Sequence, residues 1–238
     1  MLLWIGATTG SLIGCRRRRS QPTVSFGPTS LAAAAHAAAL PSCVVRPVQT
    51  EGPYFVDEKL NRADIRVDPS DGSVRPGVPL QLQFSVSRIS DGRCDALSAA
   101  TVDVWHCDAG GIYSDVRDPR FDTRGKKFLR GYQLTDAKGT AQFNTIYPGW
   151  YEGRAVHIHF KIRADSASRG REFTSQLYFE EAITDQVHQQ SPYNRHGRRT
   201  IFNNDDFGYR RGGKQLIPAL AKDAQGYNAK FEIGLQLD

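Results

Sequence analysis

Residues 80–87 read Leu-Gln-Leu-Gln-Phe-Ser-Val-Ser. Apolar and polar residues alternate strictly, which is the period of a β-strand with one buried face. The same alternation returns near the end of the chain, at Phe231, Ile233, Leu235 and Leu237. Both stretches therefore predict strands that lie on a hydrophobic core.

Further strands are expected where short apolar runs are bounded by Gly, Pro and Asp turns. They cover residues 101–107, 131–135, 140–146, 156–162 and 173–179. Asp-Ala-Lys-Gly at residues 136–139 predicts a hairpin turn, and a short helix is expected at residues 185–190 with Thr184 as N-cap. This pattern predicts an all-β fold: a β-sandwich with long loops and one or two short helices.

The N-terminal segment differs from the rest. Residues 1–15 are apolar, four arginines follow, and residues 31–40 are rich in alanine. This order is typical of an export signal, including the twin-arginine type, while Cys15 or Cys43 suits a lipid anchor. We expect an exported protein, whether periplasmic, secreted or lipid-anchored, with residues 1–42 as the signal and residues 43–238 as one catalytic domain. The alternative is a disordered extension on a cytoplasmic protein.

Charge and hydropathy argue against a nucleic-acid-binding surface and against a membrane span. The formal net charge is +6, but residues 1–50 hold five arginines and no acid, so the remainder carries only +1. This balance predicts no nucleic-acid surface. Neither apolar N-terminal stretch reaches the ~20 residues of a membrane span. A basic cluster near the end surrounds Asp205 and Asp206, and we interpret it as a solvated loop; its members are Arg195, Arg198, Arg199, Arg210, Arg211 and Lys214.

No cysteines occur as a C-x-x-C pair, which disfavours a zinc site. Cys94 and Cys107 lie at expected strand edges. A disulfide between them and two buried free thiols are equally compatible with the sequence.

The chemistry centres on His157-Ile158-His159. On a strand, residues two apart share a face, so both imidazoles point away from the core side of Val156, Ile158 and Phe160. Such a pair is a ready metal chelate, although it also occurs in cupins and zinc sites. A cupin would need a nearby glutamate, and none follows until Glu172.

Two tyrosines follow glycine-containing turns close to this strand. Tyr151 ends Pro-Gly-Trp-Tyr at residues 148–151, six residues before His157, and Tyr113 ends Gly-Gly-Ile-Tyr at residues 110–113. Glycine permits the tight exits from strands that would carry both rings toward the histidines. Taken singly, each tyrosine is more typical of a packed ring.

The combination resembles the intradiol ring-cleavage dioxygenases, in an exported single-chain branch of the catechol and protocatechuate enzymes. Four segments carry the resemblance: Gln-Thr-Glu-Gly-Pro-Tyr-Phe at 49–55, Val-Asp-Val-Trp-His-Cys-Asp-Ala at 102–109, residues 147–160 from Tyr-Pro-Gly-Trp-Tyr to His-Ile-His-Phe, and Thr-Ser-Gln-Leu-Tyr-Phe at 174–179. The long helical N-terminal segment of the cytosolic catechol enzymes is missing, so the oligomeric state stays open, a homo-oligomer included.

The resemblance implies one non-haem Fe(III) per chain, held by Tyr113, Tyr151, His157 and His159. Phenolate oxygen is a hard anionic donor that favours the ferric state. The implied substrates are a catechol and O2, and the product is a cis,cis-muconate-type diacid. A catechol would displace Tyr151 from the metal.

The resemblance also assigns roles around the metal. It places Arg154 over the substrate ring, Gln176 behind the site and Tyr54 in the substrate pocket. His106 is expected to be structural, and the remaining histidines, His36, His188 and His196, are expected to be exposed.

Two other functions remain open from the residues alone. One is a cupin-like or zinc-dependent hydrolase that uses His157 and His159. The other is a β-sandwich module that binds carbohydrate or another ligand, with Tyr113 and Tyr151 as stacking rings.

Overall fold

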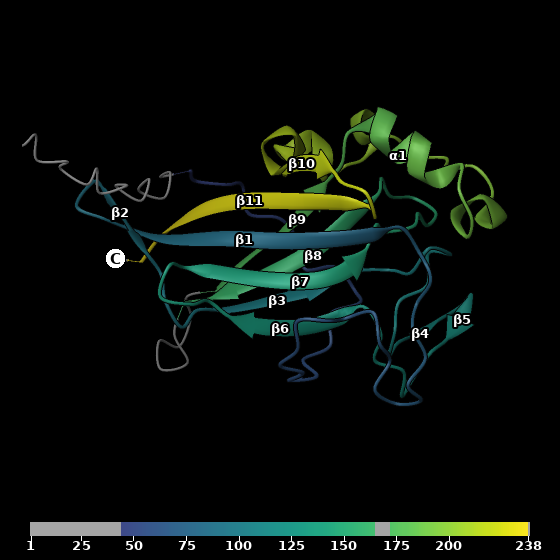
Figure 1. Ribbon diagram of the computed structural model, residues 1–238. Helices are drawn as coiled ribbons and strands as arrows, with labels where there is room; N and C mark the ends of the chain where they lie inside the picture. The colour runs from purple at the N-terminus through teal and green to yellow at the C-terminus, as the bar shows by residue number, and fades with distance from the viewer. Residues whose placement is uncertain (1–43, 165–171, 238) are drawn as a thin grey trace, which may run out of the picture. The chain divides into compact units, whose positions relative to one another are not determined.

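The structure is a computed structural model that describes residues 44–164 and 172–237. Two sheets form the frame of these residues (Figure 1). β1 (Pro79–Ser90) lies at the centre of the first sheet. On one edge it pairs with a parallel β11 (Tyr227–Gln236), which in turn pairs with β10 (Ala219–Lys222). On the other edge it pairs with two antiparallel strands, β7 (Thr140–Ile146) and β2 (Arg93–Ala96). The second sheet is antiparallel throughout, in the order β6 (Arg130–Leu134), β3 (Thr101–Trp105), β8 (His157–Arg163) and β9 (Glu172–Tyr178). The predicted strands are therefore confirmed.

Aromatic side chains join the two sheets. The Phe84 ring of β1 lies 5.1 Å from the Phe160 ring of β8, and Phe160 lies 5.4 Å from Phe231 of β11. All three side chains are buried, and each such burial stabilises the fold by roughly 1.5–3 kcal/mol. The sequence therefore folds as the expected β-sandwich.

The predicted hairpin at residues 136–139 is wrong. The turn itself is present, because the Gly139 amide donates to the Asp136 carbonyl at 2.9 Å. Its two strands do not pair with each other: β6 pairs with β3, and β7 pairs with β1 in the other sheet. The turn residues specify a reversal of the chain, but the choice of partner strand depends on distant residues.

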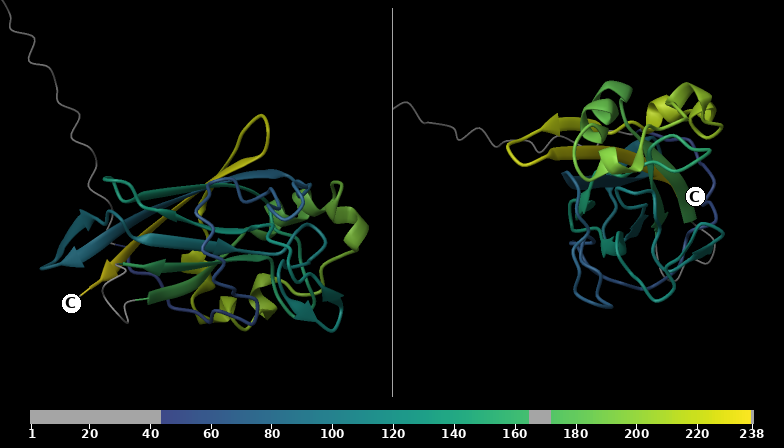
Figure 2. Two further views of the ribbon diagram at one scale, coloured as in Figure 1. Left: turned by 90° about the horizontal axis from the view of Figure 1, so that it is seen from below. Right: turned by 90° about the vertical axis from the view of Figure 1, so that its right-hand side faces the viewer.

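Helical segments gather on one side of the sheets (Figure 2). The helix α1 (Glu181–His188) begins earlier than expected, with Glu180 rather than Thr184 at its N-cap. Thr184 is buried inside the helix, where its hydroxyl bonds the Glu180 carbonyl and the Tyr147 hydroxyl. Four 3-10 turns follow: η1 (Tyr193–His196), η2 (Asn203–Asp205), η3 (Tyr209–Arg211) and η4 (Gly213–Leu216).

Neither interpretation of Cys94 and Cys107 holds. Cys107 is a buried free thiol whose sulfur lies 3.5 Å from the Gly149 carbonyl oxygen. Cys94, in β2 of the other sheet, takes part in a disulfide that does not include Cys107. The expectations for residues 1–43, including the signal and a lipid anchor at Cys15 or Cys43, fall outside the described residues. Within residues 44–164 and 172–237, no helix is long and apolar enough to cross a membrane.

The fold brings several loops together at one end of the sandwich. β3 ends at Trp105, opposite His159 near the start of β8. The loops that leave β3 and enter β8 lie at the end that also carries α1 and the two-stranded β4 (Arg117–Asp118) and β5 (Phe121–Asp122) (Figure 1).

Candidate metal centre

The outer face of the second sheet forms the floor of the site. Strand register places Trp105, His159 and Gln176 side by side on β3, β8 and β9, with His157 opposite Tyr178 in the adjacent row. Because side chains alternate along a strand, all five point away from the core side. The predicted common face of the two histidines is confirmed.

The two histidines present nitrogen atoms to each other. His157 Nδ1 donates to the Ala155 carbonyl at 2.7 Å, which leaves the lone pair on its Nε2. That Nε2 lies 2.9 Å from His159 Nε2 and 3.2 Å from the Tyr151 hydroxyl. Burial, and then the nearby positive charge of Arg154, lower the pKa of His157 well below its usual value. Burial does the same to His159, so both rings are held in the neutral form that binds metals.

Tyr113 reaches the same point from the loop after β3. Gly111 makes this approach possible: its φ is +80°, and a Cβ there would lie 2.3 Å from the Trp150 carbonyl oxygen. The Tyr113 side chain is 1% exposed, and its hydroxyl is buried without a hydrogen-bond partner. Its ring lies 5.7 Å from that of Tyr151. Burial raises the pKa of both phenols, and at Tyr113 the neighbouring Tyr151 adds to the effect.

This donor set fits a ferric ion. A buried polar atom without a partner costs about 1–3 kcal/mol, so the unpartnered Tyr113 oxygen calls for a ligand. Two phenol oxygens and two imidazole nitrogens converge here, and a bound cation reverses the pKa shifts that burial imposes on phenols. In the described part of the chain, no group of three or more His, Cys, Asp or Glu side chains could hold a metal ion. A metal centre at this site therefore depends on tyrosine oxygen.

Arg154 stands beside the centre in a buried ion pair. Its Nε donates to Asp206 Oδ2 at 2.8 Å, and its Nη1 lies 3.5 Å from His157 Nε2. The side chains of Arg154 and Asp206 are 11% and 0% exposed. Burial alone would raise the pKa of Asp206, but the Arg154 guanidinium and the Ala155 and Tyr209 amides outweigh it and lower that pKa.

The ion pair of Arg154 and Asp206 is not a surface contact, because both partners are buried. The expected solvated loop is confirmed for Asp205 and for five of the six basic residues, which are exposed. It is wrong for Asp206, which is buried, and for Arg199, which is buried and paired with Glu181 and Asp185. Asp206 could not be predicted as a site residue from the sequence, since nothing in the residues around it links it to Arg154.

Gln176 holds Arg154 from the other side. Its Oε1 accepts from Arg154 Nη2 at 2.6 Å and from the Tyr178 hydroxyl at 3.0 Å, and its amide donates to the Thr50 carbonyl at 2.9 Å. Gln49 accepts from the Tyr178 hydroxyl at 2.9 Å. The segment around residues 49–55 is thereby tied over the outer face of the sheet.

Tyr54 covers the centre. Its ring stacks on Tyr113 with centroids 4.5 Å apart and meets Tyr151 edge-on at 6.1 Å. The Tyr54 hydroxyl donates to Asp118 Oδ2 at 2.7 Å. The centroid of the Phe121 ring lies 6.5 Å from that of the Tyr54 ring. A substrate ring that approaches the metal ligands would pass this group of rings, so the predicted role of Tyr54 in the pocket remains a prediction with a consistent geometry.

Known proteins share this architecture. A family model described as Dioxygenase matches residues 50–196, more than half of the 238 residues. This chain belongs to the intradiol dioxygenase family. Members of the family use non-haem Fe(III).

Individual relatives agree with this assignment. The structure of an intradiol ring-cleavage dioxygenase from Tetranychus urticae matches with a TM-score of 0.70 and 28% identity, over 82% of this chain and 95% of that one. The dioxygenase domain of a dioxygenase and carbohydrate-binding fusion from Streptomyces sp. SirexAA-E gives a TM-score of 0.56 and 27% identity, over 82% and 100% of the two chains. Catechol 1,2-dioxygenase 1 from Acinetobacter lwoffii is 28% identical over 218 residues, which are 81% of this chain and 57% of that protein. The matched part of the chain spans between 37% and 57% of the length of the curated relatives.

The intradiol fold also decides between the open alternatives. Tyr113 is buried beneath Tyr54, so it cannot be a sugar-stacking ring on a carbohydrate-binding surface. A zinc or cupin site built on His157 and His159 alone lacks the additional His, Cys or carboxylate ligands in the described residues.

The remaining histidines take no part in the centre. His106 is structural as expected: its ring nitrogens bond the Cys107 carbonyl and the Thr145 hydroxyl, and burial lowers its pKa to about 4. His196 is exposed as expected. His188 is not: it is partly buried, stacks on Tyr193 at 5.2 Å and bonds the Pro148 carbonyl. His36 falls outside the described residues.

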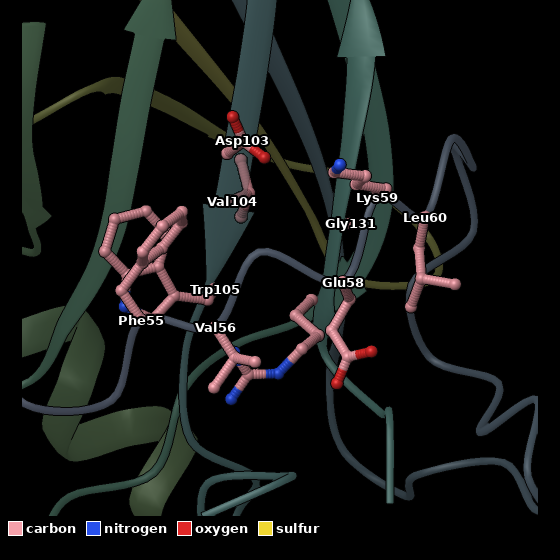
Figure 3. Close-up of a pocket in the computed structure, with 10 residues that line it drawn as sticks. Phe55, Val56, Glu58, Lys59, Leu60, Asp103, Val104, Trp105 and Gly131 are labelled. Carbon is pink, nitrogen blue, oxygen red and sulfur yellow. The ribbon is translucent and has the colours of Figure 1, made fainter. Parts of the chain in front are cut away.

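Trp105 orients His159 by stacking. The indole and imidazole planes are within 8° of parallel, with centroids 5.1 Å apart. His159 Nδ1 is buried without a hydrogen-bond partner, unlike Nδ1 of His157. Figure 3 shows Phe55 against Trp105 at one end of a small cavity whose other end holds Glu58 and Leu60. Packed rings, rather than a hydrogen bond, thus fix the orientation of the second histidine.

Replacing Trp105 by Leu is therefore expected to weaken iron binding by about 10–100-fold, the usual effect of losing a group that orients a metal ligand. Trp105→Phe keeps an aromatic ring and should lose less. Competition with a chelator measures the affinity. Phe160→Leu, on the core side of β8, is the matched control, because it lowers stability without touching the outer face. Equal iron affinity in Trp105→Leu and Phe160→Leu would contradict the positioning role.

Proposed function

We propose that this protein is a non-haem Fe(III)-dependent intradiol dioxygenase that opens the ring of catechol-type aromatics with O2 to give cis,cis-muconate-type diacids. One ferric ion per chain is held by Tyr113, Tyr151, His157 and His159. The observation that carries the proposal is the cluster of His157 Nε2, His159 Nε2 and the Tyr151 hydroxyl, next to a Tyr113 ring whose buried oxygen has no hydrogen-bond partner. Relatives named catechol and chlorocatechol 1,2-dioxygenase support a small aromatic diol as the substrate class.

The residues divide the chemistry between them. Ferric iron supplies a Lewis acid that favours phenolate over phenol and withdraws electron density from a bound catecholate, so that a ring carbon can react with O2. Tyr151 is less buried than Tyr113 and sits at the mouth of the site. Tyr151 would therefore be the residue that gives way to the substrate and takes up a catechol proton at its phenolate oxygen.

Arg154 is placed to act on charge. Asp206 and Gln176 fix its Nε and Nη2, so that Nη1 is the nitrogen nearest the histidines. A guanidinium held in this way stabilises negative charge that develops on a substrate ring without having to reorganise. Gln176 acts through Arg154 by holding it in position.

The colour of the protein tests the proposal. The purified protein should contain about one iron per chain and show a strong red tyrosinate-to-iron band, because a ferric ion bound to phenolates absorbs visible light. Tyr113→Phe removes one phenolate and should shift and weaken this band, while Tyr132→Phe, on β6 away from the ligands, should leave it unchanged. A colourless wild-type protein that still opens catechol would overturn the assignment of tyrosine ligands.

A further inference from the structure

A groove leads away from the candidate metal centre along the protein surface. Its first part begins at Tyr151 and runs between Trp150, Ile112 and Phe121 to His196 and Gly110. Its second part continues from the same His196 and Gly110 to Arg75, Pro192 and Arg195. The two hollows adjoin at these shared residues, and together they extend from a proposed metal ligand to a pair of arginines.

The junction between the two parts is firmly built. The Trp150 ring packs on His196 with centroids 4.6 Å apart, and its indole nitrogen donates to the Gly197 carbonyl at 3.4 Å. Gly111 lies directly beneath, where a Cβ would come within 3.1 Å of His196 Nε2. The first part is therefore walled by apolar rings on a fixed backbone, a surface suited to an apolar group.

Charge differs between the two parts. In the first part, Arg120 is committed to Asp118 at 3.0 Å, and Glu152 adds a negative charge. In the second part, Arg75 lies over the Phe128 ring at 3.5 Å and makes a loose contact, at 3.6 Å, with Asp108, which also lines the hollow. The Arg75 Nε is buried without a hydrogen-bond partner. Arg195 is exposed and makes none of the ion pairs found among the described residues. The far end of the groove thus carries two guanidinium groups against one carboxylate, a surplus of positive charge that suits an anion.

From this arrangement we propose that the groove binds the substituent of an extended substrate, a catechol that carries an apolar linker ending in a carboxylate. The linker lies along Trp150 and Phe121, and the carboxylate meets Arg195 and Arg75. The position of the catechol ring rests on the proposed function, whereas the binding of the linker and carboxylate does not.

Turnover provides the first test. Iron-loaded protein is given ω-(3,4-dihydroxyphenyl)alkanoates of increasing chain length and their neutral carboxamides. We expect kcat/KM to favour the carboxylate over the amide, with an optimum at an intermediate chain length. Arg195→Glu should reduce the carboxylate-to-amide ratio by about threefold to tenfold, since it removes one surface attraction and adds a repulsion. Arg198→Glu, three residues along the same loop but outside the groove, should leave the ratio unchanged. A ratio that is the same in all three proteins would refute the proposal.

Binding to the metal-free protein provides the second test. ω-Phenylalkanoates lack the hydroxyl groups that would chelate iron, so calorimetry reports the groove alone. Binding that weakens in Arg195→Glu but not in Arg198→Glu supports the groove even if the loaded protein fails to open catechol, in which case the proposed function fails separately. Ring opening of catechol with no Arg195-dependent binding would instead leave the function standing and reject the groove.

Discussion

Arg154→Ala should lower kcat by on the order of 10²–10³, the usual loss when one fixed electrostatic contact to a transition state is removed. Steady-state kinetics on catechol, with iron measured in the same samples, records the effect. Arg154→Lys should recover only part of the rate, because an ammonium lacks the planar guanidinium that bonds Asp206 and Gln176 at once. Full turnover in Arg154→Ala would end the catalytic assignment.

Because the ion pair between Arg154 and Asp206 is buried, the effect of Arg154→Ala on kcat must be separated from its effect on stability. Removing Arg154 leaves the fully buried Asp206 carboxylate without its partner, which typically costs about 3–5 kcal/mol in the free energy of unfolding. The double variant Arg154→Ala/Asp206→Ala removes that charge as well and should regain part of the stability but none of the lost rate. Arg66→Ala breaks a half-exposed pair with Asp64 and should cost less than ~1 kcal/mol. If the rate followed stability through this series, Arg154 would be structural only.

Loss of iron is the second large effect, expected for His157→Ala. The substitution removes a nitrogen that lies within 3.2 Å of both His159 Nε2 and the Tyr151 oxygen. Because a shell of four protein ligands tolerates little loss, iron content should fall from about one per chain to near zero, and the red band and ring opening should disappear with it.

A histidine outside the centre controls for nonspecific damage. His188→Ala also removes a partly buried, stacked imidazole, but one that contacts Tyr193 and Pro148 instead of the ligands. It should keep its iron and its colour. His157→Ala protein that retained stoichiometric iron after chelator treatment would exclude this histidine as a ligand.

The sequence predicted features that depend on neighbouring residues, but not those that depend on residues far away in the chain. The alternation at residues 80–87 and 156–160 assigned faces correctly, since side-chain direction on a strand depends only on neighbouring residues. The split of β6 and β7 between two sheets depends on distant partners and could not be read from the turn at residues 136–139.

In the candidate metal centre, too, the residues in local motifs were predictable, and those that act through distant contacts were not. Tyr113, Tyr151 and the two histidines stand in recognisable motifs. Asp206 is 52 residues from Arg154, in a loop with several charged residues and no motif that links it to the centre. Trp105 could be assigned to the outer face from its alternation with Val104, but its stacking on His159 follows from strand register.

The parallel pairing of β1 with β11 bears on how the chain matures during synthesis. Phe84 faces Phe231 across this pair, and the register continues from Leu80 to Ile89. All the proposed ligands, together with Asp206, leave the ribosome before Tyr227, the first residue of β11. Until then one edge of the central strand β1 remains open, and contacts of such long sequence separation form slowly. A nascent chain that stalls in this window would carry a complete set of ligands on an unfinished sandwich, with an exposed strand edge prone to aggregation.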